Sequence, residues 1–219
     1  MAGDPVEATT LAVEGANVDA PAPPLAGPGA LTLHEQCRVV GAYQWIERRL
    51  FEVLGGWVVS EPIAEARLVF DLYSQQHAWH ADLWADRLPV LDGLDPATLT
   101  VPPGVELDRL LVQLAGGLPG EEAAGGTLLR LVGLARVVLP RLIAGYGLHL
   151  HRAAPVADGP VVRSLRLVMR DEIEAWQATE TLVQTLVHRP HDIQVVTAHQ
   201  QALEEILAGT GPGLVPWPR

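Results

Sequence analysis

The strongest constraint on the fold is a series of long amphipathic stretches whose apolar residues recur about every 3.6 positions, with proline and glycine gathered between them. The first stretch predicts a helix over about 32–54, which Gly55 and Gly56 should end. One stripe of this helix carries Val40, Tyr43, Glu47, Leu50 and Leu54. Glu47 stands out on that stripe, because a carboxylate is expensive to bury without a partner.

A second helix is predicted over about 61–87. Ser60 is a candidate N-cap, and Pro62 fits the first turn because its missing N–H costs nothing there. Proline and glycine are then frequent over 89–127, around an apolar piece at 105–116 that predicts a small helix. This segment is interpreted as a long crossover.

Three further helices are predicted, over about 127–152, 160–187 and 190–208. Pro140 should kink the first of these, because an interior proline removes one backbone hydrogen bond. The four long helices therefore form two hairpins joined by one long link, and the fifth helix closes the chain.

Composition divides the chain into an arm, a domain and a tail. Residues 1–30 combine Pro, Gly, Ala and acidic residues without helical or alternating periodicity, which predicts a disordered N-terminal arm. A chain of 219 residues that is 48% hydrophobic can fill one core, and its Leu, Val and Ala favour the all-α class. The expected helical domain covers 31–208, and a tail follows at 209–219.

Charge and cysteine content exclude several classes of protein. The formal net charge is −11, so most of the surface would repel a phosphate backbone, and nucleic acid is not an expected partner. Cys37, the only cysteine, cannot form an internal disulfide, which fits a reducing cytoplasm. No apolar run reaches the roughly 20 residues of a membrane-spanning helix, and no signal peptide is visible, so we expect a cytoplasmic protein without a membrane partner.

The most unusual residues lie on the second and fourth long helices. On the second, Tyr73, His77, His80 and Trp84 share one face, because successive spacings of four, three and four residues return to the same side of a helix. On the fourth, the sequence RDEIEAW places Glu172 within an acidic turn. Carboxylate and imidazole groups on facing helices are typical of metal sites in helical bundles.

Two hairpins, one long crossover and this set of side chains resemble the ferritin-like superfamily, in a bacterial branch with a degenerate diiron-carboxylate motif. In that family one helix of each pair supplies a lone Glu and the other supplies Glu-x-x-His. Glu47, His80 and Glu172 match three of these positions. His77 stands where the family has Glu, Ala175 stands where it has His, and the third long helix contains no carboxylate.

The resemblance implies a ferritin-like four-helix bundle with one crossover, a fifth helix and an altered metal site. The implied ligands are Glu47, His77, His80 and Glu172, whose N and O donors suit Fe or Mn, with Zn as the alternative. We expect the surrounding pocket to be lined by Tyr43, Tyr73, Trp84, Trp176 and His149. In another interpretation, His149 simply favours the negative end of its helix dipole.

The candidate ligands also have purely structural interpretations. Glu47 could pair with a neighbouring Arg and point outward, while His77 and His80 could be neutral core side chains held by hydrogen bonds. Asp171 and Glu174, which flank Glu172, are expected on a solvated helix face. Only Glu172 of this acidic turn is then a site residue.

Other side chains could take over the role of a metal or simply fill space. Arg141 and Tyr146 are candidates to compensate the buried acidic groups in place of a cation. The large side chains of Trp79, Trp84 and Trp176 are expected to pack between helices. The sequence permits compensation by a metal ion or by the protein itself.

Two functions remain open at this stage, one enzymatic and one not. The first is a metal-dependent oxidase or hydroxylase that acts on a small-molecule substrate. The alternative is a metal-free ferritin-like module that binds small molecules or other proteins, and a homo-oligomer is compatible with either. Iron storage is not supported, because the sequence shows neither an intact ferroxidase site nor cage-forming surfaces.

Overall fold

The computed structural model describes residues 30–116, 123–210, 213–215 and 217, and these residues form an all-helical fold without a β-strand. The expected disordered arm at 1–30 lies outside the described residues except for Ala30. No helix in the described part of the chain has the length and apolar character needed to cross a membrane.

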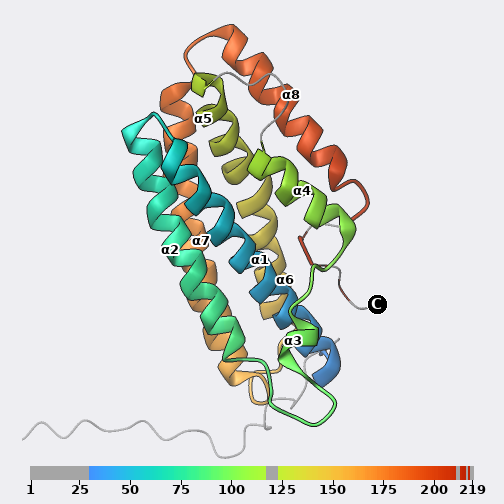
Figure 1. Cartoon of the computed structure of the whole chain (residues 1–219). Helices are drawn as coiled ribbons and strands as arrows, with labels where there is room; N and C mark the ends of the chain where they lie inside the picture. The colour runs from blue at the N-terminus through green and yellow to red at the C-terminus, as the bar shows by residue number, and fades with distance from the viewer. Residues whose placement is uncertain (1–29, 117–122, 211–212, 216, 218–219) are drawn as a thin grey trace, which may run out of the picture.

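Four long helical segments lie side by side (Figure 1). They are α1 (Leu33–Ser60), α2 (Ala64–Ala85), the continuous segment α5 (Ala123–Val132), η1 (Gly133–Val138) and α6 (Leu139–Arg152), and α7 (Gly159–Leu186). Helices α1 and α2 pack as one hairpin, and α6 packs with α7 as the other. The predicted pairing of helices is confirmed.

The described part of the crossover between the hairpins contains two helices, α3 (Pro96–Leu99) and α4 (Val105–Gly116). Helix α4 begins and ends where the sequence predicted, and it lies against both α1 and α8 (Pro190–Ile206). Helix α8 also packs on η1 and α5, so it extends the core on the side away from α2 (Figure 1).

The predicted end of the first helix at Gly55-Gly56 is wrong, since α1 continues to Ser60. A Cβ atom at Gly55 would lie 3.1 Å from Ser74 Oγ on α2. The Ser74 hydroxyl itself donates to the carbonyl of Phe51 at 3.0 Å. Gly55 therefore lets the two helices of the hairpin approach closely, and the packing of α2 overrides its tendency to end a helix.

The predicted start of the second helix at Ser60 is wrong as well, because Ser60 belongs to α1 and α2 begins at Ala64. Glu61 occupies the turn and is fully buried. Its carboxylate accepts the backbone N–H of Ile63 at 3.1 Å and also binds Thr127 and the Arg130 guanidinium of α5. The turn is thus tied to the second hairpin.

Pro140 lies within a continuous helical segment, and the kink expected at this residue stays a prediction. It lies in the first turn of α6, directly after the π-helical segment η1, in which the Leu139 N–H donates to the carbonyl of Leu134. A proline ring crowds the carbonyl of residue i−4 and offers it no N–H. The wider π turn before Pro140 accommodates that disruption without ending the helix.

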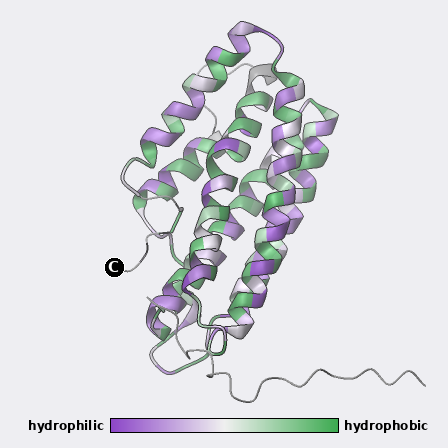
Figure 2. Cartoon of the chain, turned by 180° about the vertical axis from the view of Figure 1, so that it is seen from behind, coloured by the Kyte–Doolittle hydropathy of each residue, from purple (hydrophilic) through white to green (hydrophobic). Residues whose placement is uncertain are grey.

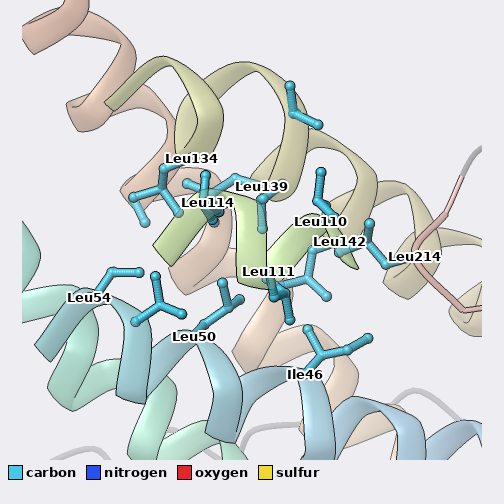
Figure 3. Close-up of a cluster of buried hydrophobic side chains, with 14 of the residues drawn as sticks. Ile46, Leu50, Leu54, Leu110, Leu111, Leu114, Leu134, Leu139, Leu142 and Leu214 are labelled. Carbon is cyan, nitrogen blue, oxygen red and sulfur yellow. The ribbon is translucent and has the colours of Figure 1, made fainter. Parts of the chain in front are cut away.

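Hydrophobic and hydrophilic residues are interspersed along every long helix (Figure 2). The hydrophobic residues that are buried form one core shared by the helices. A cluster of aliphatic side chains joins α1, α4, η1 and α6 (Figure 3). It contains Ile46, Leu50, Leu54, Leu110, Leu111, Leu114, Leu134, Leu139 and Leu142, all buried. We call this set the leucine cluster.

Candidate metal centre

Four ionisable side chains meet between α1, α2 and α7, and they are the four that the sequence singled out. Glu47 comes from α1, His77 and His80 from α2, and Glu172 from α7. Their side chains are at most 2% exposed. The alternative in which Glu47 points outward to a neighbouring Arg is therefore wrong. We call these four residues the Glu-His cluster.

The donor atoms of the cluster alternate between nitrogen and oxygen. His77 Nδ1 lies 2.5 Å from Glu47 Oε2 and 3.4 Å from Glu172 Oε1. His80 Nδ1 lies 3.6 Å from Glu47 Oε2 and 3.1 Å from Glu172 Oε1. The predicted contact between His80 and Glu172, with Glu47 beside it, is confirmed.

This spacing fits one metal ion. Ligands that each lie about 2.0–2.2 Å from an ion at tetrahedral angles are separated from one another by roughly 3.3–3.6 Å. Three of the four N···O distances in the cluster fall within a few tenths of an ångström of that range, and the fourth, between His77 and Glu47, is shorter at 2.5 Å. Two imidazole nitrogens and two carboxylate oxygens suit Zn, Mn or Fe.

Two polar atoms of the cluster have no partner among the described residues. They are Nε2 of His77 and Oε2 of Glu172, both fully buried. An unsatisfied buried polar atom costs about 1–3 kcal/mol. The cluster therefore keeps one nitrogen and one oxygen that its internal hydrogen bonds do not use.

Asp171 is a site residue that the sequence analysis missed. Its Oδ2 accepts from Nε2 of His80 at 3.2 Å, and its side chain is 20% exposed. A carboxylate on Nε2 holds the proton there and leaves Nδ1 free to bind toward the centre of the cluster. Neighbouring residues on a helix lie about 100° apart, so Asp171 can border a buried Glu172 while touching solvent.

Tyr146 supplies the contribution of α6, whose sequence contains neither Asp nor Glu. Its hydroxyl donates a short hydrogen bond to Oε1 of Glu47, so Oε2 of the same carboxylate faces the histidines. The expected pairing of Tyr146 is confirmed. That of Arg141 is wrong, because its guanidinium pairs with Glu204 of α8. Arg141 lies about one helical turn from Tyr146 and on the side that faces α8.

The electrostatics of the cluster favour charge on Glu47 and on both histidines. Burial alone would raise the pKa of Glu47, but the charges of His77 and His80 lower it to about 2. Burial opposes protonation of His80, yet Glu47 and Glu172 raise its pKa to about 11, and they raise that of His77 as well. For Glu172, burial and the nearby Glu47 charge raise the pKa.

Aromatic rings close one side of the cluster. The ring of Tyr43 lies 5.1 Å from that of Trp84, 4.6 Å from that of Tyr146 and 5.7 Å from that of His149, between ring centroids. Of the expected pocket residues, Tyr43, Trp84 and His149 thus gather here, and Tyr73 is buried on α2. These buried rings exclude water from the side of the cluster on which Glu47 lies.

The remaining expectations for aromatic residues are not met. Trp79 is 50% exposed and Trp176 is 38% exposed, so neither packs between helices as Trp84 does. Trp79 precedes the buried His80, and Trp176 follows the buried Ala175. Because adjacent residues of a helix point in different directions, each indole lies outside the inward face of its helix. His149 is buried with a pKa lowered to about 4, mainly by burial, so it does not act as a cation at the helix end.

The comparison with known proteins adds nothing to this geometry: no family model, no curated protein and no solved structure matches the chain.

Proposed function

We propose that this protein is a ferritin-like four-helix bundle that binds a single transition-metal ion at Glu47, His77, His80 and Glu172. The observation that carries the proposal is the alternating set of N···O distances, from 2.5 to 3.6 Å, among four buried side chains. Such distances suit donor atoms around one ion. A dinuclear centre is disfavoured, because α6 offers Tyr146 in place of a further carboxylate.

The ferritin-like relationship is supported by connectivity and by the placement of the ligands. Two antiparallel hairpins are joined by one long crossover, and the donor side chains come from facing helices of both hairpins. The chain departs from the family pattern at His77 and at Ala175, which is buried on α7. The proposed site is therefore an altered version of the family's centre.

The proposed activity is that of a metal-dependent oxidase or hydroxylase acting on a small molecule. Iron or manganese would supply redox chemistry with dioxygen at such a centre, whereas zinc would not. The protein itself orients two of the ligands through hydrogen bonds. The Tyr146 hydroxyl donates to Glu47 Oε1, and Asp171 accepts the Nε2 proton of His80. Both contacts fix which atoms face the centre. The buried, unpaired Cys37 fits a cytoplasmic location.

Metal titration of the full-length chain tests the proposal. Co²⁺ or Zn²⁺ should bind with a stoichiometry near one and raise the melting temperature, and a chelator should reverse the effect. His80→Ala should abolish this uptake, whereas His34→Ala, at an exposed position on α1, should not. Binding of less than about a tenth of an equivalent of metal to the parent protein would exclude the site.

A metal-free bundle is the second candidate, and one observation favours it. The cluster already closes on itself, through the 2.5 Å contact of His77 with Glu47 and the 3.1 Å contact of His80 with Glu172. Protonated histidines can thereby compensate both carboxylates without a cation. In that case the melting temperature would respond to neither metal nor chelator, and the chain would serve as a binding module.

A further inference from the structure

A second candidate site lies at the end of the bundle where α1 begins. There α1, α3, the loop after α3, Val215 and Trp217 line an open pocket of about 520 Å³. Its apolar walls include Val39, Ala42, Leu99, Pro102, Val215 and Trp217. This volume lies within the range of small-molecule sites, and none of the four residues of the Glu-His cluster lines it.

The pocket wall contains two charged residues, Glu35 and Arg38, and they differ in their hydrogen bonds and ion pairs. The Glu35 carboxylate is held at the start of α1, where Oε2 accepts from both the N–H and the hydroxyl of Thr32 at 2.7 Å. The hydrogen bonds with Thr32 are the main cause of the lowered pKa of Glu35, and the charge of Arg38 adds a small contribution. Arg38 itself forms no ion pair within the described part of the chain. Arg38 is therefore the wall residue best placed to receive a ligand.

One wall of the pocket is the Trp217 ring, which is held between two residues of α6. Trp217 lines the pocket, and its ring lies 5.5 Å from that of His149 and 5.6 Å from the Arg152 guanidinium, which sits over it. His149 is fully buried, and neither of its ring nitrogens has a partner within the described residues. His149 is not one of the residues that line the pocket, and it also contacts Tyr43 beside the Glu-His cluster.

We propose that this pocket binds a small apolar monocarboxylate, with its carboxylate against Arg38 and its hydrocarbon part against Leu99 and Trp217. A guanidinium matches a carboxylate in geometry and charge, and the apolar walls favour a hydrocarbon over water. The site stands apart from the proposed metal centre, because its residues differ and it requires no metal.

Three eight-carbon probes of matched size test the proposal on the full-length protein: octanoate, 1-octanol and octylamine. Isothermal titration calorimetry should show saturable 1:1 binding of octanoate, at least about tenfold tighter than binding of the other two, because only octanoate pairs with Arg38. Arg38→Gln should weaken octanoate binding about tenfold. The matched control is Arg48→Gln, an exposed position on α1 outside the pocket, which should leave the affinity unchanged.

Two further variants separate this pocket from the metal centre. Val101 lines the pocket and is 47% exposed, so Val101→Trp should fill the opening without disturbing the core and should block octanoate. His80→Ala should leave octanoate binding intact even if it abolishes metal uptake. The proposal is overturned by equal affinity for all three probes, by unchanged affinity in Arg38→Gln, by loss of binding in His80→Ala, or by no saturable binding up to about 10 mM octanoate.

Discussion

The leucine cluster and the Glu-His cluster are built on the same helix, about one turn apart, and are stabilised in opposite ways. Leu50 of α1 packs into the aliphatic side chains of α4 and α6 (Figure 3). Glu47 of α1 is equally buried, yet it depends on hydrogen bonds from His77 and Tyr146. The leucine cluster depends on close packing of apolar side chains, for which several residue types would serve. The Glu-His cluster depends on hydrogen bonds between particular side chains.

This difference bears on why the Glu-His cluster exists. Apolar side chains of similar volume often stabilise a core as well as a buried ionic network does, or better, because charges lose their hydration on burial. A cluster that also leaves His77 Nε2 and Glu172 Oε2 without partners is a poor choice for stability alone. This composition is what the proposed metal site would require.

The largest effect is expected from removing one member of the Glu-His cluster. Glu47→Ala leaves His77 and Tyr146 without their carboxylate partner and should lower the free energy of unfolding by about 3–5 kcal/mol in the presence of chelator. Urea denaturation measures the change. Glu52→Ala, on the exposed side of the same helix, is the control and should cost no more than about 0.5 kcal/mol. A loss below about 1 kcal/mol at Glu47 would contradict the burial of a charged network.

A somewhat smaller loss is expected in the leucine cluster. Leu111 of α4 is fully buried, and Leu111→Ala should cost about 3 kcal/mol through lost burial and a residual cavity. Because no ionisable group takes part, this loss should be the same at pH 6 and pH 8 and with or without metal. A loss that varied with pH or metal would mean that the two clusters are not independent.

Sequence periodicity was sufficient to predict the limits of helices whose ends depend on their own residues. Helix α4 matches its predicted limits, and α7 lies within one residue of the expected 160–187. The inward face of α2 was also predicted correctly, because the spacing of Tyr73, His77, His80 and Trp84 fixes their common side. Both histidines therefore reach Glu47 and Glu172 as expected.

The errors arose where a residue's role depends on another helix. Gly55 is a stop signal in isolation, but it serves here as a contact point for Ser74 of α2. Asp171 belongs to an acidic turn that normally faces water, and only the position of His80 on α2 makes it a partner. Whether Glu47 binds a metal, a proton-bearing histidine or both is likewise a property of the assembled site.

The two clusters should also differ in how they respond to pH in the presence of chelator. The pKa of His80 rises from about 6.5 in the unfolded chain to about 11 in the fold. Its contribution to stability is therefore fully present below pH 6.5 and is lost as the pH rises toward 11. Between pH 7 and pH 8.5 His80 alone should lower the free energy of unfolding by about 1–2 kcal/mol, and His77, whose pKa is also raised, should add to this fall.

Denaturation curves at the two pH values, compared among variants, separate this effect from others. Leu111→Ala should keep the same fall, because the leucine cluster does not titrate. His80→Gln removes the shifted imidazole and should reduce the fall by at least about half, since His77 then remains as the other histidine with a raised pKa. An equal fall in the parent and in His80→Gln would show that the pH response lies elsewhere in the chain.

The smallest effect is expected at Trp79, which lies beside the Glu-His cluster without being part of its buried side. The indole is 50% exposed, and its only ring contact in the described residues is with His80, at 6.0 Å between centroids. Trp79→Ala should therefore change the free energy of unfolding by no more than about 0.5 kcal/mol, as for other surface substitutions. Trp84→Ala, five residues further along α2 and fully buried, is the matched comparison and should cost about 3–5 kcal/mol. A large loss at Trp79 would mean that the outer face of α2 is covered in solution, which a concentration-dependent melting temperature would then reveal as self-association.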